Sequence, residues 1–196
     1  MIREFLTQLK PAVLMLLAMT LLTGVIYPFF VTGVAQAAFQ YQANGSLLRE
    51  HGHAIGSELI GQPFDDPKYF WGRLSATTPV PYNAAASNGS NLGPTNPALL
   101  QAAVARIKAL READPENTAA VPVDLVTASA SGLDPHISPA AAEFQVHRVA
   151  KARKMDEAAV RKWVARYTEP RTLEVLGEYR VNILKLNLAL DSLSGP

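Results

Sequence analysis

The residue types best suited to chemistry lie in one short segment, from Asp124 to Ser138. It carries two carboxylates, a histidine and several hydroxyl groups, and its candidate binding or catalytic residues are Asp124, Thr127, Ser129, Ser131, Asp134 and His136. A histidine oriented by a carboxylate can activate a serine hydroxyl, which is hydrolase chemistry. Such triads are assembled from distant segments, however, and no Gly-x-Ser-x-Gly motif is present. We therefore expect these side chains to hydrogen-bond one another and fix a turn, and a membrane-anchored envelope hydrolase is the alternative.

A second polar segment, from Tyr82 to Asn96, contains no charged residue. Asn and Ser side chains bond backbone groups in turns, glycine permits positive φ, and the segment leads into a helix N-terminus that can attract a ligand. The simpler interpretation is an elaborate helix cap, since no Lys-Ser or Lys-Thr follows the glycines as in a Walker A loop. Its candidate partner- or ligand-binding residues are Asn83, Ser90, Asn91, Gly93, Thr95 and Asn96.

Composition excludes several classes of site. The chain has no cysteine, so disulfides, thiolate zinc sites and a cysteine nucleophile are excluded. His51 and His53 have no third ligand nearby in the sequence, and we predict no metal site. A formal net charge of +1 gives no basic field of the kind that nucleic acid binding requires. The lack of cysteine in a chain with a membrane segment also favours a bacterial envelope protein.

The elements that position these residues begin with an apolar segment. No Asp, Glu, Lys or Arg occurs between Pro11 and Leu48, and residues 12–34 are almost all apolar. About 20 apolar residues in a helix cross a bilayer, so we predict a transmembrane helix over residues 12–34. Arg3 and Lys10 precede it, and by the positive-inside rule residues 1–11 are cytoplasmic. Residues 35–196 then form a soluble domain outside the cytoplasm.

A cleaved signal peptide is the alternative interpretation of this segment. Ala35-Gln36-Ala37 has the small-x-small pattern of a cleavage site, and cleavage there would release a secreted binding protein. The apolar core of a signal peptide is about 7–15 residues long, and this one is longer. The length therefore favours an uncleaved anchor.

The pattern of the remaining residues predicts one α+β domain with a small sheet and three or four helices. Asn96-Pro97 and Ser138-Pro139 each read as an N-cap followed by a first-turn proline. The expected elements are short strands and turns over 44–96, a helix over 97–111, a loop over 113–120, a strand over 121–128, a helix over 139–153, a helix from Asp156 to before Pro170, and an ambiguous 180–193 for which helix is preferred.

Some side chains have simpler structural roles. Phe70, Trp71, Trp163 and Tyr167 are expected in the core. His147 is expected at the surface of its helix. The basic helix end is expected to be solvated and favourable to the helix dipole, and consists of Arg148, Lys151, Arg153 and Lys154.

Several blocks of this sequence resemble the KdpC family, the C subunits of the bacterial high-affinity Kdp potassium-transporting P-type ATPase. The blocks are residues 56–62, 69–73, 82–83 with 89–97, 124–129 with 132–141, and 180–182 with 186–187. Three departures affect local turns: Leu74 in place of a usual proline, Lys154 where a glycine often ends the helix, and Tyr179 where Gly-Glu-Pro-Arg is usual.

The resemblance implies a non-catalytic accessory subunit in the inner membrane with no cofactor of its own, in a complex that uses ATP, Mg²⁺ and K⁺. Its partners would be a channel-like potassium-translocating subunit, a P-type ATPase subunit and a small membrane peptide. The family is described as a catalytic chaperone that raises the ATP affinity of the ATPase subunit. A domain outside the cytoplasm could act on ATP only through the membrane subunits. The alternative is a cap or filter at the potassium entrance, because neutral oxygens coordinate potassium.

Overall fold

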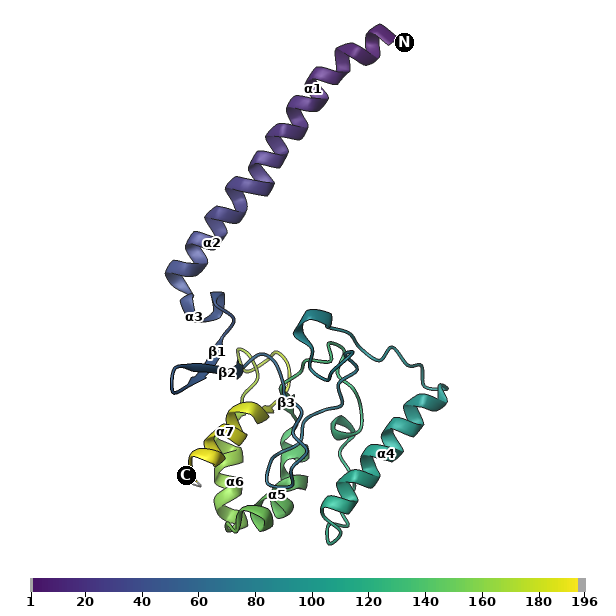
Figure 1. Cartoon of the computed structure of the whole chain (residues 1–196), viewed down its shortest axis with the longest axis vertical. Helices are drawn as coiled ribbons and strands as arrows, with labels where there is room; N and C mark the ends of the chain where they lie inside the picture. Colours follow the sequence, from purple (N-terminus) through teal and green to yellow (C-terminus); the bar gives the residue numbers. More distant parts are fainter. Residues whose placement is uncertain (1, 194–196) are drawn as a thin grey trace. The chain divides into compact units, whose positions relative to one another are not determined.

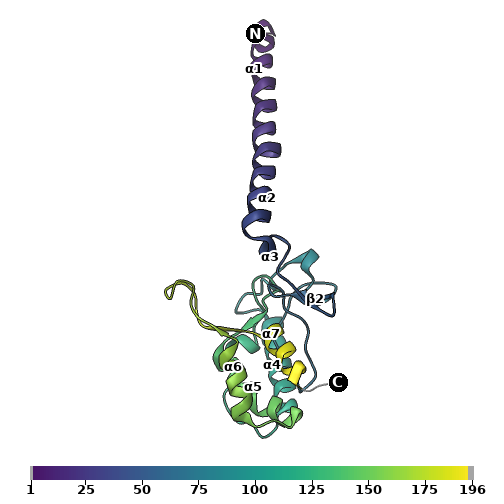
Figure 2. The same cartoon turned by 90° about the vertical axis from the view of Figure 1, so that its left-hand side faces the viewer.

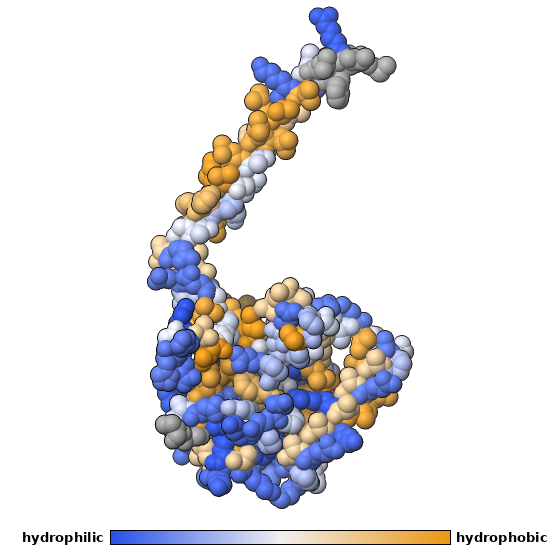
Figure 3. Space-filling view, in the orientation of Figure 1, coloured by the Kyte–Doolittle hydropathy of each residue, from blue (hydrophilic) through white to orange (hydrophobic). Residues whose placement is uncertain are grey.

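The computed structural model describes residues 2–193 and divides the chain near Leu47 into two compact units (Figure 1, Figure 2). The first unit is a long helix, formed by α1 (Ile2–Leu21), a π-helical turn η1 (Leu22–Ile26) and α2 (Tyr27–Ala38). A short helix α3 (Gln40–Ala43) follows. Within Thr7–Ala38, an 18-residue window has a mean hydropathy of 2.1 and none of that window is buried. Hydrophobic residues cover most of the length of this helix (Figure 3). The predicted span of residues 12–34 lies within this helix, which is long and apolar enough to cross a membrane.

The π-helical turn interrupts the hydrogen bonding of the long helix. Pro28 lies two residues after this turn and has no N–H to donate to the carbonyl four residues before it. The hydroxyl of Thr23 donates to the carbonyl of Met19 at 2.7 Å. A widened turn beside a proline is a common way for a long helix to accommodate a missing hydrogen bond.

The second unit contains four α-helices and two small sheets within the described part of the chain. The helices are α4 (Pro97–Ala113), α5 (Pro139–Arg153), α6 (Glu157–Arg166) and α7 (Ile183–Leu193). One sheet has the order β3-β5-β4 and is antiparallel, formed by β3 (His136–Ile137), β5 (Arg180–Asn182) and β4 (Thr168–Glu169). The other is the pair β1 (Leu47–Glu50) and β2 (His53–Ser57). The α+β class and the helix number are as predicted.

The helix starts confirm the predicted caps. The side chain of Asn96 accepts a hydrogen bond from the Ala98 amide, and that of Ser138 accepts one from the Ala141 amide. Each cap is followed by a proline, whose missing N–H costs nothing in the first turn. Asp156 occupies the N-cap position of α6 without a side-chain bond to the helix.

The predicted strand over residues 121–128 is wrong. The segment instead contains a short 3-10 helix η3 (Val123–Leu125) and a single parallel bridge between Leu74 and Ala128. A backbone carbonyl that would bond a neighbouring strand is bonded by a side chain instead: the guanidinium of Arg106 donates to the Leu125 carbonyl at 3.2 Å. Strand propensity is therefore overridden by tertiary contacts.

Two further expectations were correct only in part. Residues 180–193 contain both candidate structures, because β5 covers 180–182 and α7 begins at Ile183. The Asn182 side chain accepts a hydrogen bond from the Lys185 amide at the junction. In the region 44–96, strands occur only at β1 and β2, and the rest is turns and a 3-10 helix η2 (Ala84–Ala86).

The core of the second unit lies among α5, α6, α7 and β5. Phe70 and Trp71 are buried in it as predicted, while Trp163 and Tyr167 are partly buried against it with their rings stacked. On α4, the apolar residues Leu100, Val104, Ile107 and Leu110 recur every three or four positions, but only Leu110 of these four is buried.

The prediction that the basic residues at the end of α5 are solvated is wrong for Arg148 and Arg153. Arg148 is only 4% exposed, and the Arg153 side chain is equally buried. Arg148 donates to the carbonyl of Pro67 at 2.7 Å and lies 4.4 Å from the centre of the Trp71 ring. These arginines are buried because backbone carbonyls and aromatic faces replace water around them. The His147 side chain is also only 36% exposed, and its Nδ1 lies 2.8 Å from a carboxylate oxygen of buried Asp114.

Candidate functional site

Asp134 is the centre of the polar cluster that the sequence singles out. One carboxylate oxygen accepts a hydrogen bond from the His136 backbone amide at 3.0 Å and lies 3.3 Å from His136 Nδ1. The other oxygen lies 3.2 Å from Nη1 of Arg73, a residue 61 positions earlier in the chain. The predicted turn-fixing contacts are therefore present between Asp134 and His136, and Arg73 joins them from a distant segment.

A row of alternating charges continues across the three-stranded sheet. His136 Nε2 on β3 lies 3.6 Å from a carboxylate oxygen of Glu169 on β4. The same Glu169 oxygen accepts a hydrogen bond from Arg180 Nε, on the central strand β5, at 2.9 Å. Arg73, Asp134, His136, Glu169 and Arg180 thus form one connected set, which we call the Asp134 network.

The electrostatics of the network favour the charged form of Asp134. Burial raises the pKa of this carboxyl, but hydrogen bonds from His136 and the charge of Arg73 outweigh burial and hold the pKa below its usual range. Arg73 is fixed in turn because its Nη2 donates to the Ala128 carbonyl at 3.1 Å.

The geometry does not form a hydrolytic triad. Both ring nitrogens of His136 face carboxylates, and among the described residues none of the nearby serines, Ser129, Ser131 or Ser138, bonds to the ring. The Ser138 hydroxyl caps α5 and the Ser131 hydroxyl accepts a bond from the Leu133 amide. A nucleophile needs a hydroxyl within hydrogen-bond reach of its base, and no such pair is present at this histidine.

A hollow of about 290 Å³ opens beside the Asp134 network. It brings together three of the predicted residues, Asp124, Asp134 and His136, with Ser138, Arg73 and Arg180. The Asp124 carboxylate accepts a hydrogen bond from the Ser138 amide at 2.7 Å, so it fixes the start of α5. The remaining three, Thr127, Ser129 and Ser131, are outside this lining: the Thr127 hydroxyl donates to the Val123 carbonyl, Ser129 is buried, and the Ser131 hydroxyl accepts from the Leu133 amide. The mixed charges of the hollow suit binding of a polar group more than proton transfer.

The six candidate residues of the second polar segment, from Tyr82 to Asn96, fall into two groups. Asn83 and Asn96 have capping roles, at η2 and α4 respectively. The other four candidates, Ser90, Asn91, Gly93 and Thr95, are exposed. The two segments are joined at the Ser131 carbonyl, which accepts from the Asn88 amide at 3.0 Å and from the Ser87 hydroxyl at 3.1 Å.

Sequence reasoning missed the residues that join these segments. The Ser75 hydroxyl donates to the Gly132 carbonyl at 2.7 Å and accepts from the Tyr82 amide at 2.9 Å. The Tyr82 hydroxyl donates to the Arg73 carbonyl, and burial raises the pKa of Tyr82 to about 12. The only sequence signal for Arg73 was its place in the block of residues 69–73 that resembles the KdpC family. No sequence signal pointed to Glu169.

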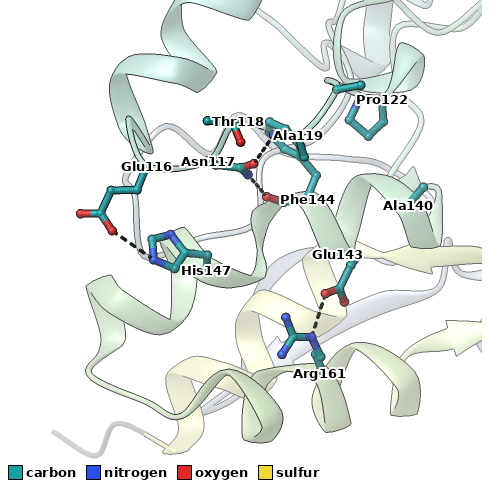
Figure 4. Close-up of a pocket in the computed structure, with 11 residues that line it drawn as sticks. Glu116, Asn117, Thr118, Ala119, Pro122, Ala140, Glu143, Phe144, His147 and Arg161 are labelled. Atoms are coloured by element: carbon teal, nitrogen blue, oxygen red, sulfur yellow. Dashed lines mark hydrogen bonds and ion pairs between the residues drawn. The ribbon is translucent and has the colours of Figure 1, made fainter.

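Another hollow, of about 730 Å³, lies elsewhere and was not predicted. The loop at 116–122 and helices α5 and α6 line it, with Phe144 among the apolar residues (Figure 4). At its edge the Arg161 guanidinium bonds Glu143 at 2.7 Å, and His147 lies 3.6 Å from Glu116. Glu116 and Glu143 are thus both engaged by cations, and the described residues contain no cluster suited to a metal ion.

Comparison with known proteins identifies the family. The family described as "KdpC: K+-transporting ATPase, c chain" matches residues 9–192. The chain belongs to this KdpC family. A protein of Sorangium cellulosum named "Potassium-transporting ATPase KdpC subunit" is 66% identical over 186 residues, covering 95% of this chain and 98% of the relative. Similarly named proteins of Methylococcus capsulatus and Herpetosiphon aurantiacus are 65% and 61% identical, and each match covers at least 94% of both chains.

Family membership confirms the resemblance of the sequence blocks, and the structure explains one departure from the KdpC pattern. Lys154, where glycine often stands, adopts a left-handed conformation with φ 56° at the C-terminus of α5. Glycine is the residue that fits such a helix end without strain. Leu74 forms its bridge to Ala128, and Tyr179 lies exposed just before β5.

Proposed function

We propose that the chain is a non-catalytic accessory subunit of an ATP-driven potassium uptake complex in the bacterial inner membrane. The observation that carries this proposal is the helix Thr7–Ala38, which is apolar, unburied and part of a chain matching KdpC over residues 9–192. Such a surface needs lipid or partner helices around it. The proposed partners are a channel-like potassium-translocating subunit, a P-type ATPase subunit and a small membrane peptide.

The state of the polar side chains supports a non-catalytic role. In the Asp134 network each carboxylate faces a cationic group or His136, and no activated hydroxyl lies beside that histidine in the described residues. The chain has no cofactor of its own in this proposal. ATP, Mg²⁺ and K⁺ act in the other subunits.

The proposed orientation follows from charge. Arg3 and Lys10 precede the apolar segment of residues 12–34, and the positive-inside rule then favours a cytoplasmic N-terminus and a second unit outside the cytoplasm. A chaperone effect on ATP affinity then requires coupling through the membrane helices. Thr20, Thr23 and Gly24, at and beside the π-helical turn, offer a small hydroxyl-bearing surface for close packing against a partner helix.

A co-purification experiment tests the subunit role. The full-length chain carries an affinity tag and is captured from detergent-solubilised bacterial membranes that contain the whole complex. We expect a P-type ATPase subunit and a channel-like subunit to co-purify in constant ratio. A chain that elutes alone under mild detergent conditions would contradict the proposal.

Orientation has its own test, because the chain contains no cysteine. Single cysteines replace Thr7, before the apolar segment, and exposed Val123 in the second unit. A membrane-impermeant maleimide applied to spheroplasts should label V123C and leave T7C unlabelled until the cells are lysed. The reverse pattern would place the second unit in the cytoplasm.

A second candidate role is a cap at the potassium entrance. The exposed, uncharged loop with Ser90, Asn91 and Thr95 supports it, because neutral oxygens are the ligands that potassium prefers. Replacing Asn91 and Thr95 with alanine should weaken the apparent potassium affinity of the complex without changing its assembly. An unchanged potassium dependence of ATPase activity would remove this candidate.

A further inference from the structure

The segment between β4 and β5 forms a narrow hairpin that stands away from the helices of the second unit (Figure 2). Near its end Thr172 and Leu176 bridge each other, with both amides donating to the opposite carbonyl at 2.9 Å. We call residues 171–178 the hairpin tip. Its arms lead back directly to Glu169 and Arg180, so its position is fixed by the three-stranded sheet.

The hairpin tip presents apolar side chains to the outside. Leu173 is 82% exposed, Val175 is 75% exposed, and Leu176 is more than half exposed. Three large apolar side chains within four residues are an unusual display for a surface turn, where polar residues and glycine dominate.

This display is held in place by specific interactions. The Arg171 guanidinium bonds the Glu178 carboxylate across the base of the tip at 2.6 Å. Leu173 and Glu174 have positive φ values of 54° and 63°. A left-handed backbone is unfavourable for residues with a side chain, and such strain is concentrated where a segment has a binding role.

The charge of Glu174 indicates which of three partners fits the hairpin tip: a lipid bilayer, a second copy of the chain or another protein. Glu174 lies between Leu173 and Val175 and has no ion pair among the residues described. A carboxylate in the middle of the apolar surface opposes insertion into a bilayer with anionic lipids. Pairing with the tip of a second copy would bring two Glu174 side chains of like charge together. A protein surface with an apolar pocket and a lysine or arginine at its rim could bury the apolar side chains of the tip and pair with the Glu174 carboxylate.

We propose that the hairpin tip inserts into an apolar, cation-rimmed pocket on another subunit of the potassium-transporting ATPase. This inference rests on the proposed subunit role. In this proposal, burial of the apolar side chains of the hairpin tip supplies a large part of the affinity between the two subunits.

A matched pair of valines tests the contact. Val175 and Val123 are the same residue type and are 75% and 72% exposed, so aspartate at either position is compatible with the fold. The full-length tagged variants are captured from solubilised membranes, and the other subunits are quantified per captured chain. V175D should lower the recovery at least tenfold in washes of rising stringency, and V123D should match the unchanged chain. Equal recovery for V175D, or equal loss for both variants, would overturn the proposal.

The identity of the occupant is tested by a photo-crosslinking residue at Leu173 in the assembled complex. A crosslink to another ATPase subunit supports the proposal. Crosslinks only to lipid, or only to a second copy of the chain, overturn it. If the unchanged chain captures no other subunit, the subunit role itself fails; if it captures them and V175D does so equally well, only the hairpin inference fails.

Discussion

The side-chain amide of Asn187 makes two hydrogen bonds with the backbone of Phe70: Nδ2 donates to the carbonyl at 3.0 Å, and Oδ1 accepts from the amide at 2.9 Å. Gln145 does the same for Trp71, accepting from its amide at 2.8 Å and donating to its carbonyl at 3.1 Å. Side chains from α7 and α5 therefore replace the two neighbouring strands that this buried segment lacks. All four residues are buried, so water cannot take their place.

The first prediction concerns this arrangement. N187L leaves the buried amide and carbonyl of Phe70 without partners, and each unpaired group costs about 1–3 kcal/mol. We expect the free energy of unfolding to fall by roughly 2–4 kcal/mol. The measurement is urea unfolding of the full-length chain in detergent, followed by tryptophan fluorescence, because both tryptophans lie in the second unit.

The matched control is N88L. Asn88 is exposed and contributes only its backbone amide to the Ser131 carbonyl. Its substitution should change the free energy of unfolding by less than about 0.5 kcal/mol. Similar losses for both variants would mean that the amide pair at Phe70 is not the cause.

The second prediction concerns the close approach of Gly61 to the polar cluster. A Cβ at this position would lie 2.4 Å from the Tyr82 ring and 2.9 Å from the Asp134 carbonyl oxygen. Since the Gly61 amide also donates to the Leu133 carbonyl, the backbone has little room to shift. G61A should lower the free energy of unfolding by about 2 kcal/mol through overpacking. Gly93 has open space around its Cβ position, so G93A should be nearly neutral in the same urea assay, and a neutral G61A would contradict the packing.

Local signals in the sequence were sufficient for α4 and α5, because a cap, a first-turn proline and a period near 3.6 residues act within one segment. They were also sufficient for the turn at Asp134, whose bond to the His136 amide spans two residues. Arg73 could not be found in this way, since its contact with Asp134 depends on the whole fold. The exposure of Leu100 and Val104 was unpredictable for the same reason: an apolar stripe does not reveal whether the partner is in the same chain.

The third prediction concerns the end of α5. Lys154 has φ 56°, which costs a residue with a side chain about 1 kcal/mol relative to glycine. K154G should therefore raise the free energy of unfolding by about 1 kcal/mol. K162G, on the exposed face of α6, should lower it by a similar amount, because glycine weakens a helix interior by about 1 kcal/mol. The same substitution thus has opposite signs at two lysines, and equal signs in urea unfolding would contradict the left-handed cap.

The last prediction concerns the pH dependence of the Asp134 network. The pKa of Asp134 is held below the ordinary value of about 4, so the carboxylate stabilises the folded chain above that pH. As the pH falls through the lowered pKa, the carboxylate is protonated and the contribution is lost. D134N should therefore lower the free energy of unfolding at pH 7. We expect a loss of only roughly 1 kcal/mol, because solvent screens the ion pairs of this partly exposed carboxylate. The difference between D134N and the unchanged chain should shrink in urea titrations as the pH falls below the ordinary aspartate pKa of about 4. D156N is the control, because Asp156 makes no side-chain bond to α6. A D134N effect that stays constant from pH 7 to pH 3 would show that the charge of Asp134, and its pairing with Arg73 and His136, does not stabilise the fold.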